Sequence, residues 1–276
     1  MKADLHMHTT ESDGRLTREE LFKHVKSRNI DMISITDHDT CKHVDDNIAL
    51  AKEYGIQYIP GIELSTLYEG KNVHLLGYFR GEGYKAKKML NYYVEIKKGR
   101  EERAKKFVKN LKQFYNIEIT YQDILDVSNG IIARPHIAKA IIQKYPQYTH
   151  NEIFDRFIGD HTEAFVPSTE LHVSEGIKLL REHNCLIVLA HPKLLKHHIH
   201  DKVLAYDYDG IEAIYGMHDY ENMQYYKKIA KNRNLIITAG SDYHGIPNDH
   251  KHKDVGDVYL EGEDLKRFLE ALGKTK

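Results

Sequence analysis

The sequence has few of the features that mark disulfide-stapled, membrane-spanning or tandem-repeat proteins. It contains only two cysteines, Cys41 and Cys185, which argues against a disulfide framework or a zinc finger and favours a reducing cytoplasm. No apolar run approaches the ~18 residues of a transmembrane helix, and the MKADLHMH start lacks the apolar stretch of a signal peptide. Internal repeats, low-complexity tracts and Gly/Ser linkers are also missing. We therefore predict a soluble, cytoplasmic protein without a membrane partner.

Excess charge of either sign is missing too. The 40 Lys and Arg residues balance 41 Asp and Glu residues, which argues against a bulk nucleic-acid binder. The chain of 276 residues is 41% hydrophobic and can build a sizeable core. Its length suits one α/β barrel with an insertion, because such barrels reach ~250 residues. What the chain has in abundance is histidine, with 19 residues, and their positions decide the functional argument.

Short apolar or β-branched runs alternate with amphipathic stretches in both terminal parts of the chain. This pattern is typical of βα units that build a parallel sheet. The predicted strands cover residues 3–8, 31–36, 57–64, 73–79, 185–190, 210–215, 235–239 and 255–260. The predicted helices among them cover residues 17–28, 45–54, 173–183, 220–232 and 262–272. Thr17 and Glu20 have the spacing of a capping box, which supports a helix start there.

The alternation breaks between residues 82 and 167. A long charged helix is predicted there over 87–115, followed by shorter helices at 121–127, 135–144 and 151–158. We predict a helical insertion subdomain over 82–167 and a barrel domain formed by 1–81 and 168–276. Two independently folding halves are not expected, because no linker separates them.

Histidines and carboxylates recur at or just past the carboxyl ends of the predicted strands. His6 and His8 are two residues apart, so they share one face of the first strand and can hold one cation together. The other candidates are Asp13, His38, Glu63, His74, His191, Asp242 and His244. Barrel enzymes assemble their active sites at this edge, and six histidines gathered there without metal would each need a partner. These donors suit Mn²⁺, Fe²⁺ or Zn²⁺, and a carboxylate such as Glu63 can bridge two cations.

Six sequence motifs extend this pattern over almost the full length. DLHMHTTESDG, ITDHDT, GIELS, VHLLGY, LAHP and GSDYHG appear in this order and resemble the polymerase-and-histidinol-phosphatase (PHP) superfamily. Within it, the chain resembles the stand-alone phosphoesterases that act on nucleoside phosphates and on the 5′ ends of short RNA, because the insertion carries their Arg-x-His element as ARPHIA. The resemblance implies a distorted (β/α)7 TIM-like barrel. It also implies two or three divalent cations, Mn²⁺ foremost, with Fe²⁺ or Zn²⁺ as alternatives.

The resemblance distributes the nine candidate ligands over three cations. It implies His6, His8, Glu63 and Asp242 on one, Asp13, His38 and His244 on a second, and Glu63, His74 and His191 on a third. Every ligand position is filled, which counts against a non-catalytic relative. The residues expected to act in catalysis through the bound metals are Asp13, His38, Glu63, Asp242 and His244. The expected chemistry is in-line attack on phosphorus by a metal-activated hydroxide.

Basic residues of the insertion are the predicted substrate-binding groups. Arg134 offers a planar fork that matches phosphate, and Pro135 would start a helix whose amino terminus favours anions. His136 is the second candidate of this element. Arg100 and Arg103 could guide a second phosphate or an RNA backbone, although a run of charges is usually a solvated face.

Other histidines lie outside the six motifs. His218 follows the predicted strand 210–215 and is a further candidate for substrate binding. Two further histidine groups follow the LAHP and GSDYHG motifs rather than ending strands, and both are interpreted as loop histidines; they are His197, His198 and His200, and His250 and His252.

The predicted function is metal-dependent hydrolysis of phosphomonoesters of nucleotides. The expected substrates are nucleoside 3′,5′-bisphosphates or 5′-mononucleotides, with 5′-to-3′ trimming of short RNA as an extension. A histidinol-phosphate phosphatase is the nearest enzymatic alternative, and a non-catalytic metal-binding or regulatory module is the alternative of another class. An amidohydrolase barrel also opens with His-x-His, but Glu63 and the Asp-x-His of Asp242 and His244 fit phosphoesterase chemistry better. A small phosphorylated substrate is the predicted partner, and no stable protein partner is expected.

Overall fold

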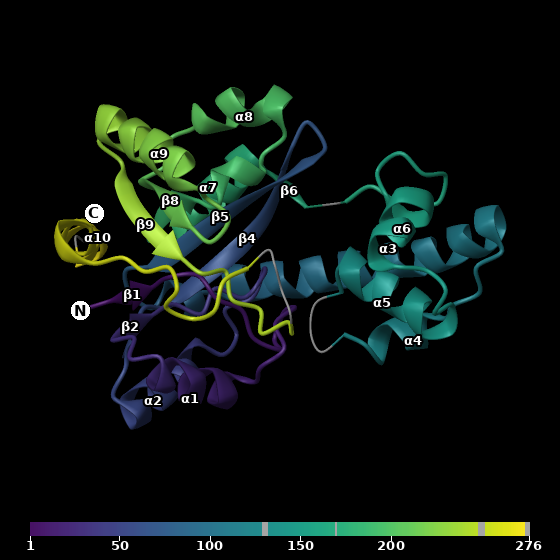
Figure 1. Ribbon diagram of the computed structural model, residues 1–276, viewed down its shortest axis with the longest axis horizontal. Helices are drawn as coiled ribbons and strands as arrows, with labels where there is room; N and C mark the ends of the chain where they lie inside the picture. Colours follow the sequence, from purple (N-terminus) through teal and green to yellow (C-terminus); the bar gives the residue numbers. More distant parts are fainter. Residues whose placement is uncertain (129–131, 169, 248–251, 274–276) are drawn as a thin grey trace. The chain divides into compact units, whose positions relative to one another are not determined.

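The protein folds into two compact units, seen here in a computed structural model that describes residues 1–128, 132–168, 170–247 and 252–273 (Figure 1). The first unit comprises Met1–Asn91 and Leu171–Lys276, and the second comprises Tyr92–Glu170. The helical insertion subdomain predicted over residues 82–167 stays a prediction. Within the described residues, none of the helices combines the length and the apolar character that a membrane span requires.

The first unit contains two hydrogen-bonded sheets with helices around them. A three-stranded parallel sheet has the order β1-β2-β3, and a six-stranded mixed sheet has the order β6-β4-β5-β7-β8-β9. The strands are β1 (Ala3–Asp4), β2 (Met32–Ile33), β3 (Gln57–Tyr58), β4 (Gly61–Tyr68), β5 (Lys71–Phe79), β6 (Leu171–His172), β7 (Cys185–Leu189), β8 (Gly210–Tyr215) and β9 (Ile236–Gly240). The α/β class is therefore confirmed.

The hairpin of β4 and β5 departs from the predicted parallel arrangement. β5 runs antiparallel to both of its neighbours, β4 and β7. Glu69 and Gly70 form the turn with φ values of 47° and 72°, the positive values that a tight hairpin turn uses. A parallel crossover needs a dozen or more residues, whereas this connection has two. The prediction was wrong here because both strands extend into the stretch that was taken as their connection.

Backbone contacts connect the two sheets on both sides. The amide of Leu5 donates to the carbonyl of Ala239 over 3.0 Å, and the amide of Glu63 donates to the carbonyl of Thr36 over 3.1 Å. The regular ladders nevertheless form two sheets, so the (β/α)7 barrel stays a prediction. The strand predicted over 255–260 is wrong, since only isolated bridges occur there and Gly256 turns the chain with φ 76°.

Helices accompany these sheets in the first unit. They are α1 (Arg18–Ser27), α2 (Val44–Tyr54), α7 (Val173–Glu182), α8 (His197–Leu204), α9 (Tyr220–Arg233) and α10 (Gly262–Gly273). Of these helices, α2, α7, α9 and α10 contact strands of the sheets. The capping box of α1 is confirmed, because the Thr17 side chain accepts from the Glu20 amide and Glu20 Oε2 accepts from the Thr17 amide. Such a cap stabilises a helix by ~1 kcal/mol.

Helix α8 corrects the interpretation of the LAHP-flanking histidines as loop residues. His197, His198 and His200 lie in this helix, which buries Ile199 and Val203. The spacing of these two apolar residues could have indicated the helix, because residues four apart share one face of a helix.

Two apolar clusters stabilise the first unit. Ala3, Leu76 and Val188 belong to a cluster shared by β1, β5 and β7, together with Phe268 of α10. Phe22 belongs to the second cluster, which packs α1 and α2 against the three-stranded sheet. The strands are thereby fixed from both sides, so the residues that follow them are held in defined positions.

The described part of the second unit is built from helices. Helix α3 (Lys87–Tyr115) begins in the first unit and ends in the second, followed by α4 (Tyr121–Leu125), α5 (Arg134–Lys144), α6 (His150–Ile153) and a π-helical turn (Phe154–Ile158). Phe107, Leu111, Ile141 and Ile158 are fully buried members of its separate core.

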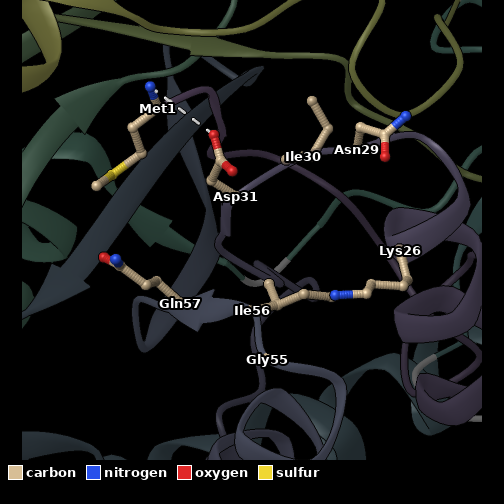
Figure 2. A pocket seen from close by; sticks show the side chains of 8 residues that line it. All are labelled: Met1, Lys26, Asn29, Ile30, Asp31, Gly55, Ile56 and Gln57. Atoms are coloured by element: carbon tan, nitrogen blue, oxygen red, sulfur yellow. Dashed lines mark ion pairs between the residues drawn. The ribbon is translucent and has the colours of Figure 1, made fainter.

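A pocket of about 400 Å³ opens at the amino-terminal edge of the three-stranded sheet (Figure 2). Its lining comes from the segments before β1, β2 and β3, from the first residue of β3 and from the end of α1, with Met1, Lys26, Asn29, Ile30, Asp31, Gly55, Ile56 and Gln57. Because β1, β2 and β3 run parallel, residues that follow these strands lie at the opposite edge.

Candidate metal centre

Nine His, Asp and Glu side chains of the first unit, with Glu63 among them, converge in one cluster. Six of them follow β1, β2, β7 or β9; these are His6, His8, His38, His191, Asp242 and His244. Glu63 and His74 instead lie inside β4 and β5, so the prediction that Glu63 ends a strand is wrong. A parallel bridge sets Glu63 level with His38, and the carbonyl of His74 accepts from Ala190, next to His191.

The first group consists of His6, His8, Glu63 and Asp242, all buried. The Nε2 atoms of His6 and His8 lie 3.2 Å apart, and each lies 3.1–3.3 Å from both Glu63 Oε2 and Asp242 Oδ1. The ligand atoms of all four residues lie within 4.8 Å of one another, and five of their six separations are 3.1–3.3 Å. These separations are close to the ~3.3 Å edge of a tetrahedron whose centre is ~2.0 Å from each corner, the bond length of a protein-bound divalent metal such as Zn²⁺. The group therefore has the spacing of a cation site.

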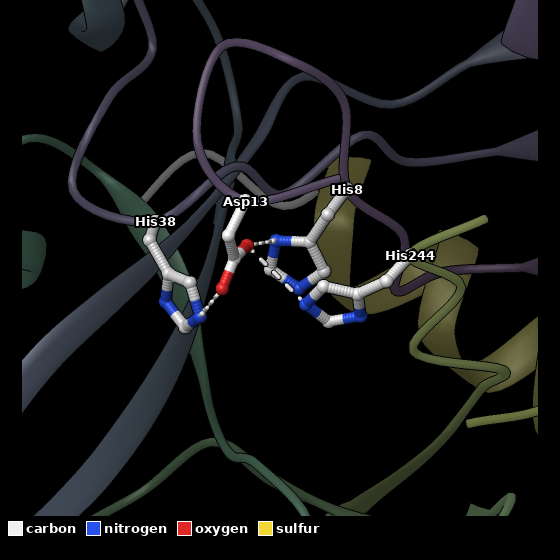
Figure 3. A group of neighbouring side chains, drawn as sticks. All are labelled: His8, Asp13, His38 and His244. Atoms are coloured by element: carbon white, nitrogen blue, oxygen red, sulfur yellow. Dashed lines mark ion pairs between the residues drawn. The ribbon is translucent and has the colours of Figure 1, made fainter. Parts of the chain in front are cut away.

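The second group surrounds Asp13 (Figure 3). Asp13 Oδ1 lies 3.2 Å from His244 Nε2 and 3.7 Å from His8 Nδ1, and Asp13 Oδ2 lies 3.7 Å from His38 Nε2. Three of these residues, Asp13, His38 and His244, are those that the family resemblance implies for one cation. The structure adds His8, whose two ring nitrogens face the first and second groups.

The third group places Glu63 between several rings. Glu63 Oε1 lies 2.9 Å from His74 Nδ1 and 3.0 Å from His191 Nε2, while Glu63 Oε2 lies 3.2 Å from His38 Nδ1. The buried Nδ1 of His38 makes no hydrogen bond, and a cation between it and Glu63 would satisfy both. Since one oxygen of Glu63 faces the first group and the other faces His74 and His191, this carboxylate is placed to bridge cations.

The carboxylates of the centre are held ionised. Burial raises the pKa of Asp13, Glu63 and Asp242, but the surrounding histidine rings lower each pKa by more, so all three lie well below the usual range. Burial lowers the pKa of His38 to about 3. Burial also lowers the pKa of His8, yet its contacts with Asp242 and Glu63 raise that pKa to about 10. Buried anions beside imidazoles fit divalent cations, which take the place of ring protons.

Asp37 orders the loop that carries Asp13, and sequence reasoning missed it. This buried carboxylate accepts hydrogen bonds of 2.7 Å from the Thr9 amide, the Thr9 hydroxyl and the Ser12 hydroxyl. The position of Asp37 next to His38 in the ITDHDT motif could have indicated a role beside the metal centre. Glu212 and Tyr215 were missed as well; both are buried in β8, where a carboxylate inside an apolar strand could have been noticed.

His252, which the sequence interpretation took as a loop histidine rather than a ligand, also lies beside the centre. Its ring stacks on His244 with the centroids 4.2 Å apart, and its Nε2 lies 3.6 Å from Asp242 Oδ2. Nothing in the six motifs marks this position. His250, interpreted in the same way, lies outside the described residues.

The predicted phosphate-binding residues belong to the second unit. Arg134 begins α5, donates to Asp160 Oδ1 over 2.6 Å, and lies above the rings of Phe154 and Phe165. His136 is buried in the first turn, where its Nδ1 accepts from the Ala133 amide over 3.0 Å. The helix predicted from Pro135 is present and begins one residue earlier, at Arg134, with Pro135 in its first turn.

Arg100 and Arg103 already hold a neighbouring segment of the second unit. Arg100 donates to Glu170 Oε1, and Arg103 Nε donates to the carbonyl of Val166, each over 2.9 Å. Burial lowers the pKa of Arg103 to about 10, which leaves it charged at neutral pH. A guanidinium has five N–H donors, so these contacts do not use all the donors of either side chain. Guidance of a phosphate by Arg100 and Arg103 stays a prediction.

His218 has a structural contact that the sequence did not predict. Its Nδ1 donates to the carbonyl of Ala213 over 3.0 Å, and burial lowers the pKa of its ring. This hydrogen bond supports the backbone of β8 next to the centre. A role for His218 in substrate binding stays a prediction.

Replacing Gly240 with Ala is expected to disrupt the centre from behind. An added Cβ would lie 2.2 Å from His6 Cβ and 2.6 Å from Glu212 Oε1, and neither neighbour can move without displacing a candidate ligand. We expect the free energy of unfolding of the metal-free protein to fall by about 3 kcal/mol. Urea denaturation measures this loss. Gly81→Ala is the control, because a Cβ there meets nothing within 4 Å; equal stability of the two variants would contradict the tight contact.

Comparison with known proteins gives a consistent result. The PHP domain family matches residues 4–239. The chain is 28% identical over 251 residues to a 5′-3′ exoribonuclease of Haemophilus influenzae, covering 88% of this chain and 90% of that protein. It is 24% identical to a 3′,5′-nucleoside bisphosphate phosphatase of Chromobacterium violaceum, covering 87% and 86% of the two chains. A solved Bifidobacterium adolescentis protein, classed as a metal-dependent phosphoesterase, superposes with a TM-score of 0.80 at 25% identity over 98% and 96% of the two chains.

Proposed function

Because the chain belongs to the PHP domain family and is a metal-dependent phosphoesterase, we propose that its substrates are phosphate esters of nucleotides. Nucleoside 3′,5′-bisphosphates and 5′-mononucleotides are the proposed small substrates, and short 5′-phosphorylated RNA is the proposed extended one. Two relatives support this class, since one is named for RNA and the other for nucleoside bisphosphates. The observation that carries the proposal is the gathering of eight metal-type donors around Glu63.

We assign the nine donors to two or three divalent cations, with Mn²⁺ as the first candidate and Fe²⁺ or Zn²⁺ as alternatives. The ligands are His6, His8, Asp13, His38, Glu63, His74, His191, Asp242 and His244. Bound cations would supply water activation and neutralise the charge of the phosphate oxygens. The chain's own part is to keep the carboxylates ionised and to fix the rings, as the low pKa values of Asp13, Glu63 and Asp242 support.

Arg134 and His136 are the proposed phosphate-binding residues. Phosphoryl transfer needs positioning and charge neutralisation more than covalent chemistry. The contacts of Arg134 with Asp160, Phe154 and Phe165 hold its guanidinium in place, so little side-chain freedom is lost when it binds an anion. The first turn of α5 adds backbone N–H groups that favour a phosphate.

Replacing Arg134 with Ala is expected to lower kcat/KM for nucleotide substrates by about 10–100-fold, because it removes charge-assisted hydrogen bonds to phosphate. Initial rates of phosphate release measure this. Arg156→Ala is the matched control, since Arg156 belongs to the same unit and lies above the rings of Tyr148 and Phe157. If both variants lose activity equally, the effect comes from the unit's stability and the assignment of Arg134 is wrong.

A substrate panel tests the proposed function. Phosphate release is measured from nucleoside 3′,5′-bisphosphates, 5′-mononucleotides, short 5′-phosphorylated RNA and histidinol phosphate, with Mn²⁺ and with a chelator, in the wild type and in Asp13→Ala. We expect Mn²⁺-dependent release from the nucleotides that is lost in the variant. Selective release from histidinol phosphate would identify a histidinol-phosphate phosphatase. No release from any compound would instead favour a non-catalytic metal-binding or regulatory module.

A further inference from the structure

Strand β8 carries one extra residue next to the metal centre. Glu212 pairs with Thr238 and Ile214 pairs with Ala239, so Ala213 has no partner in β9. Side chains alternate along a strand, and residues three apart normally point to opposite faces. The β-bulge changes this register, so Glu212 and Tyr215 both reach the centre.

His218 stabilises the bulge. A bulged residue leaves the ladder, so its carbonyl needs another donor. The ring of His218 supplies it, with Nδ1 donating to the carbonyl of Ala213 over 3.0 Å. The bulge is therefore a fixed feature of β8, and the two side chains that flank it are fixed with it.

Glu212 joins two candidate ligands that belong to different cations. Its side chain is fully buried, with Oε1 3.0 Å from His6 Nδ1 and Oε2 accepting the His191 amide over 2.8 Å. His191 has φ 27°, an uncommon backbone conformation for a residue with a side chain, and the Glu212 contact holds it there. Both carboxylate oxygens are thus used inside the protein rather than on a cation.

Tyr215 completes the support from β8. Its hydroxyl donates to Asp242 Oδ2 over 2.9 Å, while Asp242 Oδ1 faces His6 and His8. One strand therefore supports three candidate ligands from behind, and none of its contacts occupies the ligand atoms themselves.

We propose that Glu212 is a positioning residue that fixes the orientation and the tautomer of the His6 ring. With Oε2 accepting the His191 amide and Oε1 accepting from His6, the Nδ1 of His6 carries the hydrogen that faces Oε1. The Nε2 of His6 then keeps its lone pair for a cation, as in the carboxylate–histidine–metal arrangement of many metal sites. This inference rests on the proposed ligand set and is independent of the substrate.

The variant Glu212→Gln tests this role with almost no change in shape. The His191 amide can only donate, so the Gln oxygen is expected to face it, and the Gln amino group then faces His6 Nδ1. That contact requires Nδ1 to accept, which moves the ring hydrogen to Nε2, where it competes with the cation. We expect Zn²⁺ affinity at one site to weaken by about 10–100-fold.

The measurement is Zn²⁺ binding to chelator-treated protein, followed by competition with a chromophoric chelator. Glu221→Gln is the matched control, because it makes the same chemical change at an exposed position of α9 and should bind Zn²⁺ like the wild type. The unfolding temperature of each metal-free variant shows whether the fold is kept. A folded Glu212→Gln protein with wild-type Zn²⁺ affinity would overturn the proposal.

A second measurement needs no variant. Long-range ¹H–¹⁵N spectra of the Zn²⁺-loaded wild type, with ¹⁵N-labelled histidine, show which His6 nitrogen carries hydrogen. We expect hydrogen on Nδ1 and zinc on Nε2, and the reverse would contradict the role of Glu212. Because neither measurement uses a substrate, a failure here is distinguishable from a failure of the proposed hydrolysis.

Discussion

Replacing Glu63 with Gln is expected to lower kcat/KM for phosphate release at least ~10³-fold. The two oxygens of Glu63 lie 2.9–3.2 Å from ring nitrogens of five histidines, which belong to all three groups. Glutamine keeps one of these oxygens and puts an amino group in place of the other, and an amino group cannot bind a cation. The variant should therefore lose cations from more than one group. Phosphate release and metal content per chain measure both effects.

Glu69→Gln is the control for this variant. Glu69 lies in the turn of the same hairpin, where it forms an ion pair with Lys202 at 2.7 Å. An exposed pair of this kind contributes little to stability, so activity and metal content should stay at wild-type levels. If Glu63→Gln keeps wild-type activity while it is folded, the bridging assignment of Glu63 is wrong.

Removing the metal with a chelator is expected to abolish phosphate release and to lower Tm. A cation that binds only the folded state stabilises it by ~2.7 kcal/mol when its concentration is 100 times Kd. For a chain of this size that corresponds to a fall in Tm of about 5–10 °C for each site emptied. Differential scanning calorimetry and a phosphate assay of the same sample measure the two effects.

Returning Mn²⁺ to the chelated protein should restore both quantities, which separates metal loss from irreversible damage. A chelated protein that keeps its Tm and its rate after its metal content has fallen to zero would contradict the account. The buried His and carboxylate groups would then stabilise one another without a cation.

Several features of the centre could be predicted because short motifs follow strands. His191, Asp242 and His244 follow within four residues of runs that the structure confirms as strands, whereas the first predicted strand, 3–8, is shortened to Ala3–Asp4 and so ends before His6 and His8. The carboxyl ends of parallel strands share one edge, so their approach follows from the sequence order alone. The capping box of α1 could also be predicted, from the spacing of Thr17 and Glu20.

Other features depend on pairing that no local pattern contains. Glu63 and His74 lie inside an antiparallel hairpin, and only the register of β4 with β5 and of β5 with β7 brings them beside the other rings. Glu212 and Tyr215 depend on a bulge, which the alternation of apolar residues in GIEAIY does not show. His252 stacks on His244 through a tertiary contact between loop residues.

The substrate-binding predictions depended on residue type, the ARPHIA element and local position, and none of these shows which groups already have partners. Arg134 was expected to meet phosphate, and the structure adds its contacts with Asp160 and two aromatic rings. The partner of Arg100 is Glu170, far away in sequence. A helical sequence pattern predicts the helix in which such a residue lies but not the residues that its side chain contacts.

The central claim is that the cluster around Glu63 holds the divalent cations on which hydrolysis depends. The most direct test reloads chelated wild-type protein stepwise with Mn²⁺ and measures bound metal per chain and phosphate release from a nucleoside 3′,5′-bisphosphate in the same samples. The account predicts saturation at two or three ions per chain and no release from the metal-free protein, with the rate rising as the sites fill. Release at the full rate from protein without bound metal would contradict it.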